Sequence, residues 1–304
     1  MSSLKNKQKA YLQLHLAVLL FGITAILGKL ITLDSIALVW NRLWIAVLGL
    51  VFMPGAIRGL RTISRKNLIR FVGIGFLVAL HWITFYGSIK LGNNASITLA
   101  CLATTSLFTS VLEPLITKSK FKLMELFLGA LVVVGIVFLT GVGASYYPAI
   151  IVGLVSALLA ALFSSLNKKY LQTNNSISVS ILELFSGFVL ISLCFPLIQN
   201  FLPQNNWIPL YNDWLYLLIL GICCTSVAYA LSLNALKELS AFVSNLSINL
   251  EPVYGILLAI WLLGESKDLN SNFYIGTSII LISVLLHPII TKIRKRNQLK
   301  EGKV

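Results

Sequence analysis

The chain has 304 residues, of which 57% are hydrophobic and 11% are charged, and its formal net charge is +14. A soluble domain carries about a quarter of its residues as charged side chains, so this composition excludes an ordinary soluble enzyme and a disordered chain. The basic residues lie in short runs between apolar segments, whereas nucleic-acid-binding proteins gather them on a folded polar surface. The composition therefore predicts an integral membrane protein with no nucleic-acid partner.

Ten apolar segments have the length of a membrane-spanning helix, which needs about 20 residues. Gly, Pro or clustered polar residues separate most of them, as is typical of turns. In chain order the segments lie at 12–31, 35–53, 68–88, 95–117, 123–142, 148–169, 178–199, 213–234, 240–263 and 272–291. The sequence thus predicts an all-α integral membrane protein with ten transmembrane helices.

Lysine and arginine residues are distributed unevenly between the two ends of these segments. If the N-terminus is cytoplasmic, 20 of them lie on the cytoplasmic side and only 2, Lys90 and Lys267, on the other. Cytoplasmic loops of membrane proteins carry such an excess of basic residues. The distribution predicts a multi-pass protein of the cell (inner, or cytoplasmic) membrane with both termini cytoplasmic.

The two halves of the chain have the same order of segments. Residues 88–129 overlay residues 235–276 without a gap at a shift of 147. The two stretches agree better in apolar character than in residue identity. The alternative to a true repeat is therefore that all apolar helices look alike. Because each half has an odd number of helices, the second half would enter the membrane in the opposite direction. The sequence therefore predicts two inverted five-helix repeats, 1–145 and 146–304, an architecture typical of secondary transporters.

Three stretches carry a resemblance to a known family: HWITFYGSIKLGNNAS at 81–96, ALKELSAFVSNLS at 235–247 and EPVYGILLAIWLLGES at 251–266. With the arrangement of five plus five helices, they resemble the drug/metabolite transporter superfamily, specifically its EamA-type branch. The resemblance covers essentially the whole chain. Members of that family export amino acids and other small metabolites, and an aromatic amino-acid exporter is among them. The resemblance implies an exporter of small organic solutes and leaves an amino acid, a drug-like cation, a nucleoside or a vitamin open as the cargo.

Polar residues form one face of the ninth segment. At helical spacing, and with two flanking asparagines, they are Ser240, Ser244, Asn245, Ser247, Asn249, Glu251 and Tyr254. A carboxylate in the middle of a membrane costs at least ~2.5 kcal/mol, so Glu251 invites a functional role. We expect the part of this face from Ser247 to Tyr254 to contact a solute in a central cavity. The alternatives are contacts between helices for the small polar residues and, for Glu251, a buried pairing with Arg42 or with a helix end.

An aromatic patch marks the third segment. His81, Trp82 and Tyr86 lie close together in the sequence, and Tyr229 falls opposite Trp82 at the shift of 147. Such a set suits an aromatic or amphipathic solute, because the rings stack and the imidazole provides a hydrogen bond or handles a proton. We expect these residues to line the binding site. The alternative is the belt of Trp and Tyr residues at membrane interfaces.

Arg42 and Glu183 occupy matching positions in the second and seventh segments. Their opposite charges would pair across the two halves, or each would contact the solute, because an unpaired charge inside a membrane is costly. Together with Glu251 they are candidates for a charge pair or for proton coupling. Glu251 favours an amine and Arg42 a carboxylate, so the two fit a zwitterionic solute unless they neutralise each other.

These patterns predict a transporter that exports small organic solutes by alternating access around a cavity at the membrane midplane. Its expected partners are the solute and the lipid bilayer, and the sequence is compatible with proton coupling and with a homodimer. It contains no GxxxxGK[ST] motif for ATP and no motif for a metal or another cofactor. A membrane-embedded enzyme would need a catalytic pattern such as HExxH or GxSxG, which the sequence lacks. A sensor or scaffold is a further alternative, although the short loops leave no domain to relay a signal.

Overall fold

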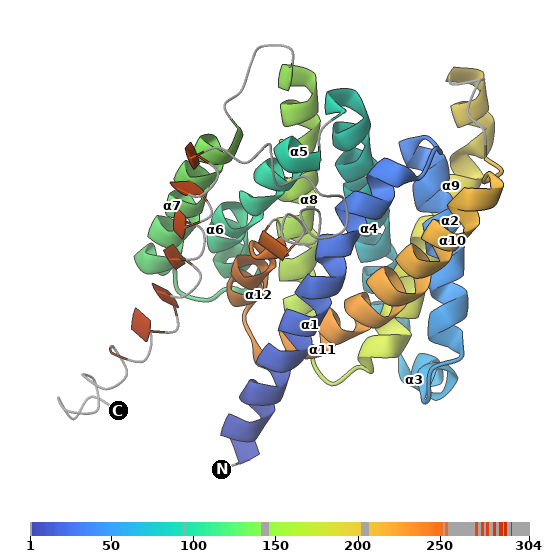
Figure 1. Ribbon diagram of the computed structural model, residues 1–304. Coiled ribbons are helices and arrows are strands. Elements are labelled where there is room, and N and C mark those ends of the chain that lie inside the picture. The colour runs from blue at the N-terminus through green and yellow to red at the C-terminus, as the bar shows by residue number, and fades with distance from the viewer. Residues whose placement is uncertain are drawn as a thin grey trace.

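The computed structural model describes residues 2–93, 95–140, 146–201, 207–251 and 253–254, together with scattered positions between 271 and 293. All of the secondary structure in this part of the chain is helical (Figure 1). The all-α class is therefore confirmed for these residues. Most of the expected ninth and tenth segments after residue 254 lies outside them.

The helices follow the expected segments closely. In chain order they are α1 (Ser2–Leu30), α2 (Ser35–Val51), α3 (Ala56–Thr62), α4 (Arg65–Gly92), α5 (Ala95–Ala103), α6 (Thr105–Thr117), α7 (Leu123–Thr140), α8 (Tyr147–Tyr170), α9 (Ser176–Phe201), α10 (Tyr211–Leu218), the π-helical η2 (Ile219–Val227), α11 (Ala228–Glu238) and α12 (Ala241–Ile248). Helical structure thus lies over each of the first eight expected segments and over the beginning of the ninth.

Many of these helices are long and apolar enough to cross a membrane. Over the described ranges there are six such spans, and a seventh is added if α2 and α3, which meet at an angle of 95°, form one bent span. In α7 the apolar stretch is shorter, Leu123–Gly135. These helices agree with a multi-pass membrane protein. The number of ten spans, the inversion of the second half and the cytoplasmic termini stay predictions.

Two of the expected segments depart locally from the α-helix. Between α5 and α6 the hydroxyl of Thr104 donates to the carbonyl of Cys101 at 2.6 Å, which offers the backbone an alternative to the helical ladder. In η2 the helix widens, and the hydroxyl of Thr225 donates to the carbonyl of Leu220, five residues earlier. Such π-helical turns occur frequently at functional sites, and Thr225 contributes to the site described below.

Small residues let α4 approach α8 and α9 closely. A Cβ atom added to Gly75 of α4 would lie 2.1 Å from the carbonyl oxygen of Glu183 in α9. One added to Gly153 of α8 would lie 3.0 Å from the hydroxyl of Ser88 in α4. Membrane helices associate through such close packing, since lipid provides no hydrophobic force between them. As a result, helices from both halves of the chain lie side by side around α4 (Figure 1).

Large apolar side chains cover much of the outside of the molecule. Leu12 and Leu16 of α1 and Phe127 and Val137 of α7 are exposed, which is costly in water and not in lipid. Many serine, threonine and asparagine side chains are buried instead. The described helices therefore combine an apolar exterior with a partly polar interior, and the site lies in that interior.

Candidate functional site

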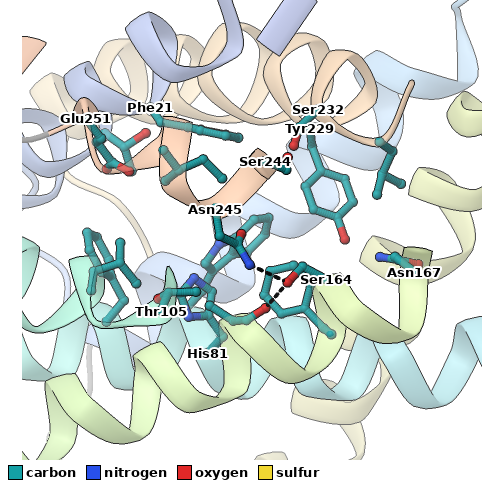
Figure 2. Close-up of a pocket in the computed structure, with 18 of the residues that line it drawn as sticks. Phe21, His81, Thr105, Ser164, Asn167, Tyr229, Ser232, Ser244, Asn245 and Glu251 are labelled. Atoms are coloured by element: carbon teal, nitrogen blue, oxygen red, sulfur yellow. Dashed lines mark hydrogen bonds between the residues drawn. The ribbon is translucent and has the colours of Figure 1, made fainter. Parts of the chain in front are cut away.

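A cavity of about 100 Å³ lies between helices of both halves of the chain (Figure 2). Its walls come mainly from α1, α4, α6, α8, α11 and α12, with Arg42 from α2. A single water needs about 10–15 Å³ on this measure, whereas many ligand sites measure ~300–1,000 Å³. In this conformation the cavity therefore suits a few water molecules or a small solute.

Arg42 presents its guanidinium group to the cavity although the residue is only 1% exposed. Its Nε donates to the hydroxyl of Thr225 (2.6 Å) and its Nη1 to the hydroxyl of Tyr86 (2.8 Å). Its Cζ lies 3.9 Å from the centre of the Trp82 ring, which is a cation–π contact. These contacts fix the orientation of the group, and Nη2 has no hydrogen-bond partner among the described residues. Arg42 can therefore donate to an anionic group in the cavity.

Glu251 lines the same cavity just after α12 and is 5% exposed. Within the described residues its carboxylate accepts no hydrogen bond and forms no ion pair. Arg42 is close enough for its charge to act on Glu251, but the two groups are not paired. Because a buried charge without a partner is costly, the site suits a ligand that carries both a positive and a negative group.

Aromatic rings surround these two charges. The ring of Trp82 lies edge-on to that of Tyr229, with their centres 6.1 Å apart. Phe163 of α8 lies 5.4 Å from the ring of His81, and Phe21 of α1 faces them across the cavity (Figure 2). Aromatic pairs of this kind accept a further ring or apolar group in offset or edge-on geometry. The walls therefore favour a solute with an apolar or aromatic part.

His81 is anchored to the backbone of α8. Its Nδ1 lies 2.9 Å from the carbonyl oxygen of Ser156, and since a carbonyl only accepts, we assign the proton to Nδ1. The hydroxyl of Ser156 donates in turn to the carbonyl of His81 (3.0 Å). The Nε2 atom then remains an acceptor on a residue that lines the cavity. His81 thus has one nitrogen that positions the ring and one that is available to a solute or to water.

Four of the residues expected to contact a solute line the cavity. They are His81, Trp82, Tyr229 and Glu251. Tyr86 is not part of the wall, but it accepts the hydrogen bond from Arg42 and so supports that residue. The four wall residues come from α4, α11 and the segment after α12, which the fold brings together from both halves of the chain.

The expected polar face of the ninth segment is only partly in the wall, where Ser244 and Glu251 lie. The hydroxyl of Ser247 donates to the carbonyl of Val243 (2.9 Å), and Asn249 donates to Ser106 of α6 (3.1 Å). Tyr254 packs against a cluster of apolar side chains. These three residues are absent from the wall of the cavity. Asn249 thus makes a contact between helices, which was the alternative to a contact with the solute.

The expected pairing of Arg42 with Glu183 does not form. Glu183 is completely buried, with 0% of its surface exposed, and it does not line the cavity. Its Oε2 accepts hydrogen bonds from the hydroxyl of Tyr229 (2.5 Å) and from Nδ2 of Asn167 (3.3 Å). Arg42 binds Thr225 instead, because the π-helical turn brings that hydroxyl within reach.

Several polar residues of the wall were not among those expected to contact a solute. Asn245 of α12 donates to Thr109 (2.8 Å) and to Ser164 (2.7 Å), and Asn167 lies farther along α8 (Figure 2). One signal was present for α8, since Ser156, Ser164 and Asn167 share a face at helical spacing. This polar face marks the side of an otherwise apolar helix that meets the cavity.

The sequence profile of the EamA-like transporter family matches residues 8–141 and, a second time, residues 147–287. The two matches together cover most of the chain. The chain belongs to the EamA-like transporter family. This EamA-like protein is therefore a multi-pass membrane transporter of the drug/metabolite transporter superfamily, which the resemblance of its three stretches predicted correctly.

Known relatives agree with this assignment. The EamA-like chain is 25% identical over 314 residues to an uncharacterized transporter of Clostridium kluyveri, with 97% of each chain covered. It is 23% identical over 309 residues to the uncharacterized transporter YxxF of Bacillus subtilis, with 99% of this chain and 96% of the relative covered. One crystal structure matches with a TM-score of 0.74 at 16% identity over 94% of this chain and 98% of its own. That last likeness shows the fold.

Proposed function

We propose that this EamA-like transporter exports small zwitterionic organic solutes with the size and chemistry of amino acids. The observation that carries the proposal is a pair of opposite charges in one cavity. Arg42 has free donors there, and Glu251 has no partner among the described residues. A zwitterion would place its carboxylate at Arg42 and its ammonium group at Glu251, where charge-assisted hydrogen bonds are strongest.

The aromatic walls and the volume of the cavity support a small solute with an apolar or aromatic side chain. Trp82, Tyr229 and Phe163 provide ring faces and edges in the cavity that Arg42 and Glu251 line. A nucleoside, a vitamin or a drug-like cation is larger than an amino acid, and a cavity of about 100 Å³ therefore favours it less. Among these alternatives a permanent cation fits least, because Arg42 faces the same space.

A cavity that lies between the two halves of the chain supports alternating access as the proposed mechanism. Many hydrogen bonds connect the halves, and two sets of them involve a buried carboxylate. Asp213 of α10 accepts from the backbone N–H (3.0 Å) and the hydroxyl (2.6 Å) of Thr32, which follows α1. Glu113 of α6 accepts from the backbone N–H groups of Ala241 (3.0 Å) and Phe242 (2.7 Å) at the start of α12. In the proposed cycle these two sets of contacts break in turn and open the cavity to one side of the membrane at a time.

The proposed orientation follows from the charge of the loops. With 20 basic residues on one side and 2 on the other, both termini lie in the cytoplasm and the protein lies in the cell membrane. Ten spans in two inverted sets of five would then place Glu113 near the cytoplasmic mouth and Asp213 near the outer one. The cycle needs a single chain, and a homodimer is compatible with it.

Three ligands of similar shape test the proposed substrate class. A ligand that binds the native state raises the melting temperature Tm of the purified protein, so thermal unfolding in detergent reports binding. L-phenylalanine carries both charges, 3-phenylpropionate lacks the ammonium group, and 2-phenylethylamine lacks the carboxylate. We expect L-phenylalanine to raise the Tm clearly more than either analogue at the same concentration. An equal shift with 2-phenylethylamine would mean that Arg42 does not contact the solute, and would contradict the proposal.

The substitution Glu251→Gln tests the role of the carboxylate. It keeps the shape of the side chain and removes its charge, so the dissociation constant for L-phenylalanine should rise about 10- to 100-fold, as expected for the loss of a charged hydrogen bond. Binding of 3-phenylpropionate should not weaken. Glu238→Gln, at the exposed end of α11, is the matched control and should bind as the unmodified protein does. In proteoliposomes Glu251→Gln should transport L-phenylalanine more slowly than the unmodified protein, and Glu238→Gln should transport it at the unmodified rate.

A further inference from the structure

A second carboxyl group lies directly behind the wall of the cavity. Glu183 of α9 has no exposed surface and is not part of the wall. Its two hydrogen-bond donors, Tyr229 and Asn167, do belong to the wall. Glu183 is therefore separated from the cavity by a single layer of side chains, and that layer is hydrogen-bonded to it.

The hydrogen bonds of this cluster are incomplete. Both donors bind Oε2 of Glu183, whereas Oε1 has no hydrogen-bond partner among the described residues, and neither has Oδ1 of Asn167. If Glu183 were ionised, the cluster would contain two unsatisfied acceptors and a buried negative charge. A proton on Oε1 removes the charge and turns one of these acceptors into a donor.

Among the described residues no cation contacts Glu183. The helices packed against α9 are α2, α3, α4 and α11, and of their titratable side chains Tyr229 is the one that contacts it. Four other buried or half-buried groups on these helices and on α8 have their own partners. Arg42 binds Thr225 and Tyr86, and Arg70 lies over Tyr170. His81 binds Ser156, and Lys168 binds the carbonyls of Leu236 and Lys237. The remaining charged side chains lie on α3 or near the ends of the helices. A negative charge on Glu183 would thus have no ion-pair partner.

Close packing shields the cluster on its other side. A Cβ atom on Gly75 of α4 would meet the backbone of Glu183 at 2.1 Å, and one on Gly187 would meet Cβ of Ala79 at 3.0 Å. Helices that are this close leave no room for water or lipid between them. The side of the cavity is therefore the route by which a proton reaches this carboxyl group.

An ionised carboxylate in such a place costs several kcal/mol, so the neutral form is the stable one at rest. We propose that Glu183 is a proton-binding site, which takes up a proton on Oε1 and exchanges it with water of the cavity past Tyr229 and Asn167. When the proton leaves to water, the carboxylate keeps both donors on Oε2. This inference rests on the proposed function, because the exchange depends on a cavity that opens to each side of the membrane.

Tyr229 connects the proton site to the solute site. Its ring lies edge-on to Trp82, and Trp82 stacks on the guanidinium group of Arg42. A solute carboxylate at Arg42 packs against these rings and moves the hydroxyl of Tyr229, which donates to Glu183. The solute therefore changes the proton affinity of Glu183, and by linkage the proton changes the solute affinity to the same extent. Glu183 then couples solute export to proton movement.

Infrared difference spectroscopy of the reconstituted protein tests the site without any transport. We expect an absorption band of a protonated carboxyl group that Glu183→Gln removes and Glu238→Gln, at an exposed position, leaves in place. Tyr229→Phe removes one donor but keeps the carboxyl, so it should shift this band. Addition of L-phenylalanine should shift the band in the unmodified protein and not in Tyr229→Phe. The inference is overturned if no protonated-carboxyl band depends on Glu183.

Proteoliposomes separate this inference from the proposed function. Counterflow of radiolabelled L-phenylalanine without a pH gradient reports solute transport, and a pH-sensitive dye reports proton movement during net flux. We expect Glu183→Gln to keep counterflow but to lose both proton movement and solute accumulation driven by a pH gradient. If the unmodified protein shows no counterflow, the proposed function is wrong and the infrared band alone decides whether Glu183 binds a proton. Counterflow with proton movement that Glu183→Gln leaves unchanged would overturn the inference and leave the proposed function intact.

Discussion

The guanidinium group of Arg42 is held by three side chains from two helices, α4 and η2. Thr225 and Tyr86 accept its hydrogen bonds, and the ring of Trp82 lies against its face. Hydrogen bonds to charged groups contribute about 1.5–3 kcal/mol each, and a desolvated cation–π contact contributes up to about 2 kcal/mol. An arginine held this way is ordered before the solute arrives, so little conformational entropy is lost on binding.

Replacement of Arg42 by lysine should therefore weaken solute binding although the charge is kept. A lysine has a single ammonium group in place of the planar fork and cannot bind Thr225, Tyr86 and a carboxylate together. We expect the dissociation constant for L-phenylalanine to rise about 10- to 100-fold, measured by isothermal titration calorimetry. Arg70→Lys is the control, since Arg70 lies 4.2 Å over the ring of Tyr170 and away from the cavity. Equal affinities for the two variants would argue against a contact between Arg42 and the solute.

The helices place these residues through irregular features rather than through straight α-helical geometry. The π-helical turn of η2 presents Thr225 to Arg42. The near contact of α4 with α9 holds Glu183 behind Tyr229. Each feature comes from small or polar residues inside an apolar segment, where they change the local path of the backbone.

Two neighbouring glycines of α4 test the close contact with α9. A Cβ atom on Gly75 would lie 2.1 Å from the carbonyl oxygen of Glu183, whereas a Cβ atom on Gly73 would have nothing within 4 Å. Alanine is the better helix former by about 1 kcal/mol, but overpacking of a tight contact costs about 1–3 kcal/mol. We therefore expect Gly75→Ala to lower the Tm in detergent and Gly73→Ala to leave it unchanged or to raise it. Similar effects of the two substitutions would show that α4 and α9 are not in such close contact.

At the scale of the whole molecule, both halves of the chain contribute to one polar interior. The first half supplies Arg42, His81 and Trp82, and the second supplies Tyr229 and Glu251. The outside is apolar wherever the long helices expose large side chains. A cavity built in this way changes its shape whenever the two halves move relative to each other, as the proposed cycle requires.

The orientation in the membrane can be tested by cysteine labelling. In a background with the four native cysteines replaced by serine, single cysteines are placed at Lys7, Lys267 and Lys300. An impermeant maleimide added to intact cells should label Lys267→Cys alone, because both termini are expected in the cytoplasm. After permeabilisation all three should be labelled. Labelling of Lys300→Cys but not of Lys7→Cys on intact cells would mean an odd number of spans and would contradict the two sets of five.

The positions of the helices could be predicted from the sequence with good accuracy. The expected segment 148–169 corresponds to α8 at Tyr147–Tyr170, and 35–53 corresponds to α2 at Ser35–Val51. The break at Thr104 and the widening in η2 could not, because they depend on hydroxyl-to-carbonyl hydrogen bonds that leave the apolar pattern unchanged.

The sequence by itself determined the class of this protein and the positions of its apolar helices. Backbone polar groups in lipid must be satisfied within each segment, so apolar length is a local property that a sequence displays directly. Only the tertiary structure decided which of these residues meet. Arg42 and Thr225 are 183 positions apart, and Glu183 and Tyr229 are 46 apart. Such pairings depend on how each helix is rotated and how closely it packs, and those quantities are set by many weak contacts at once.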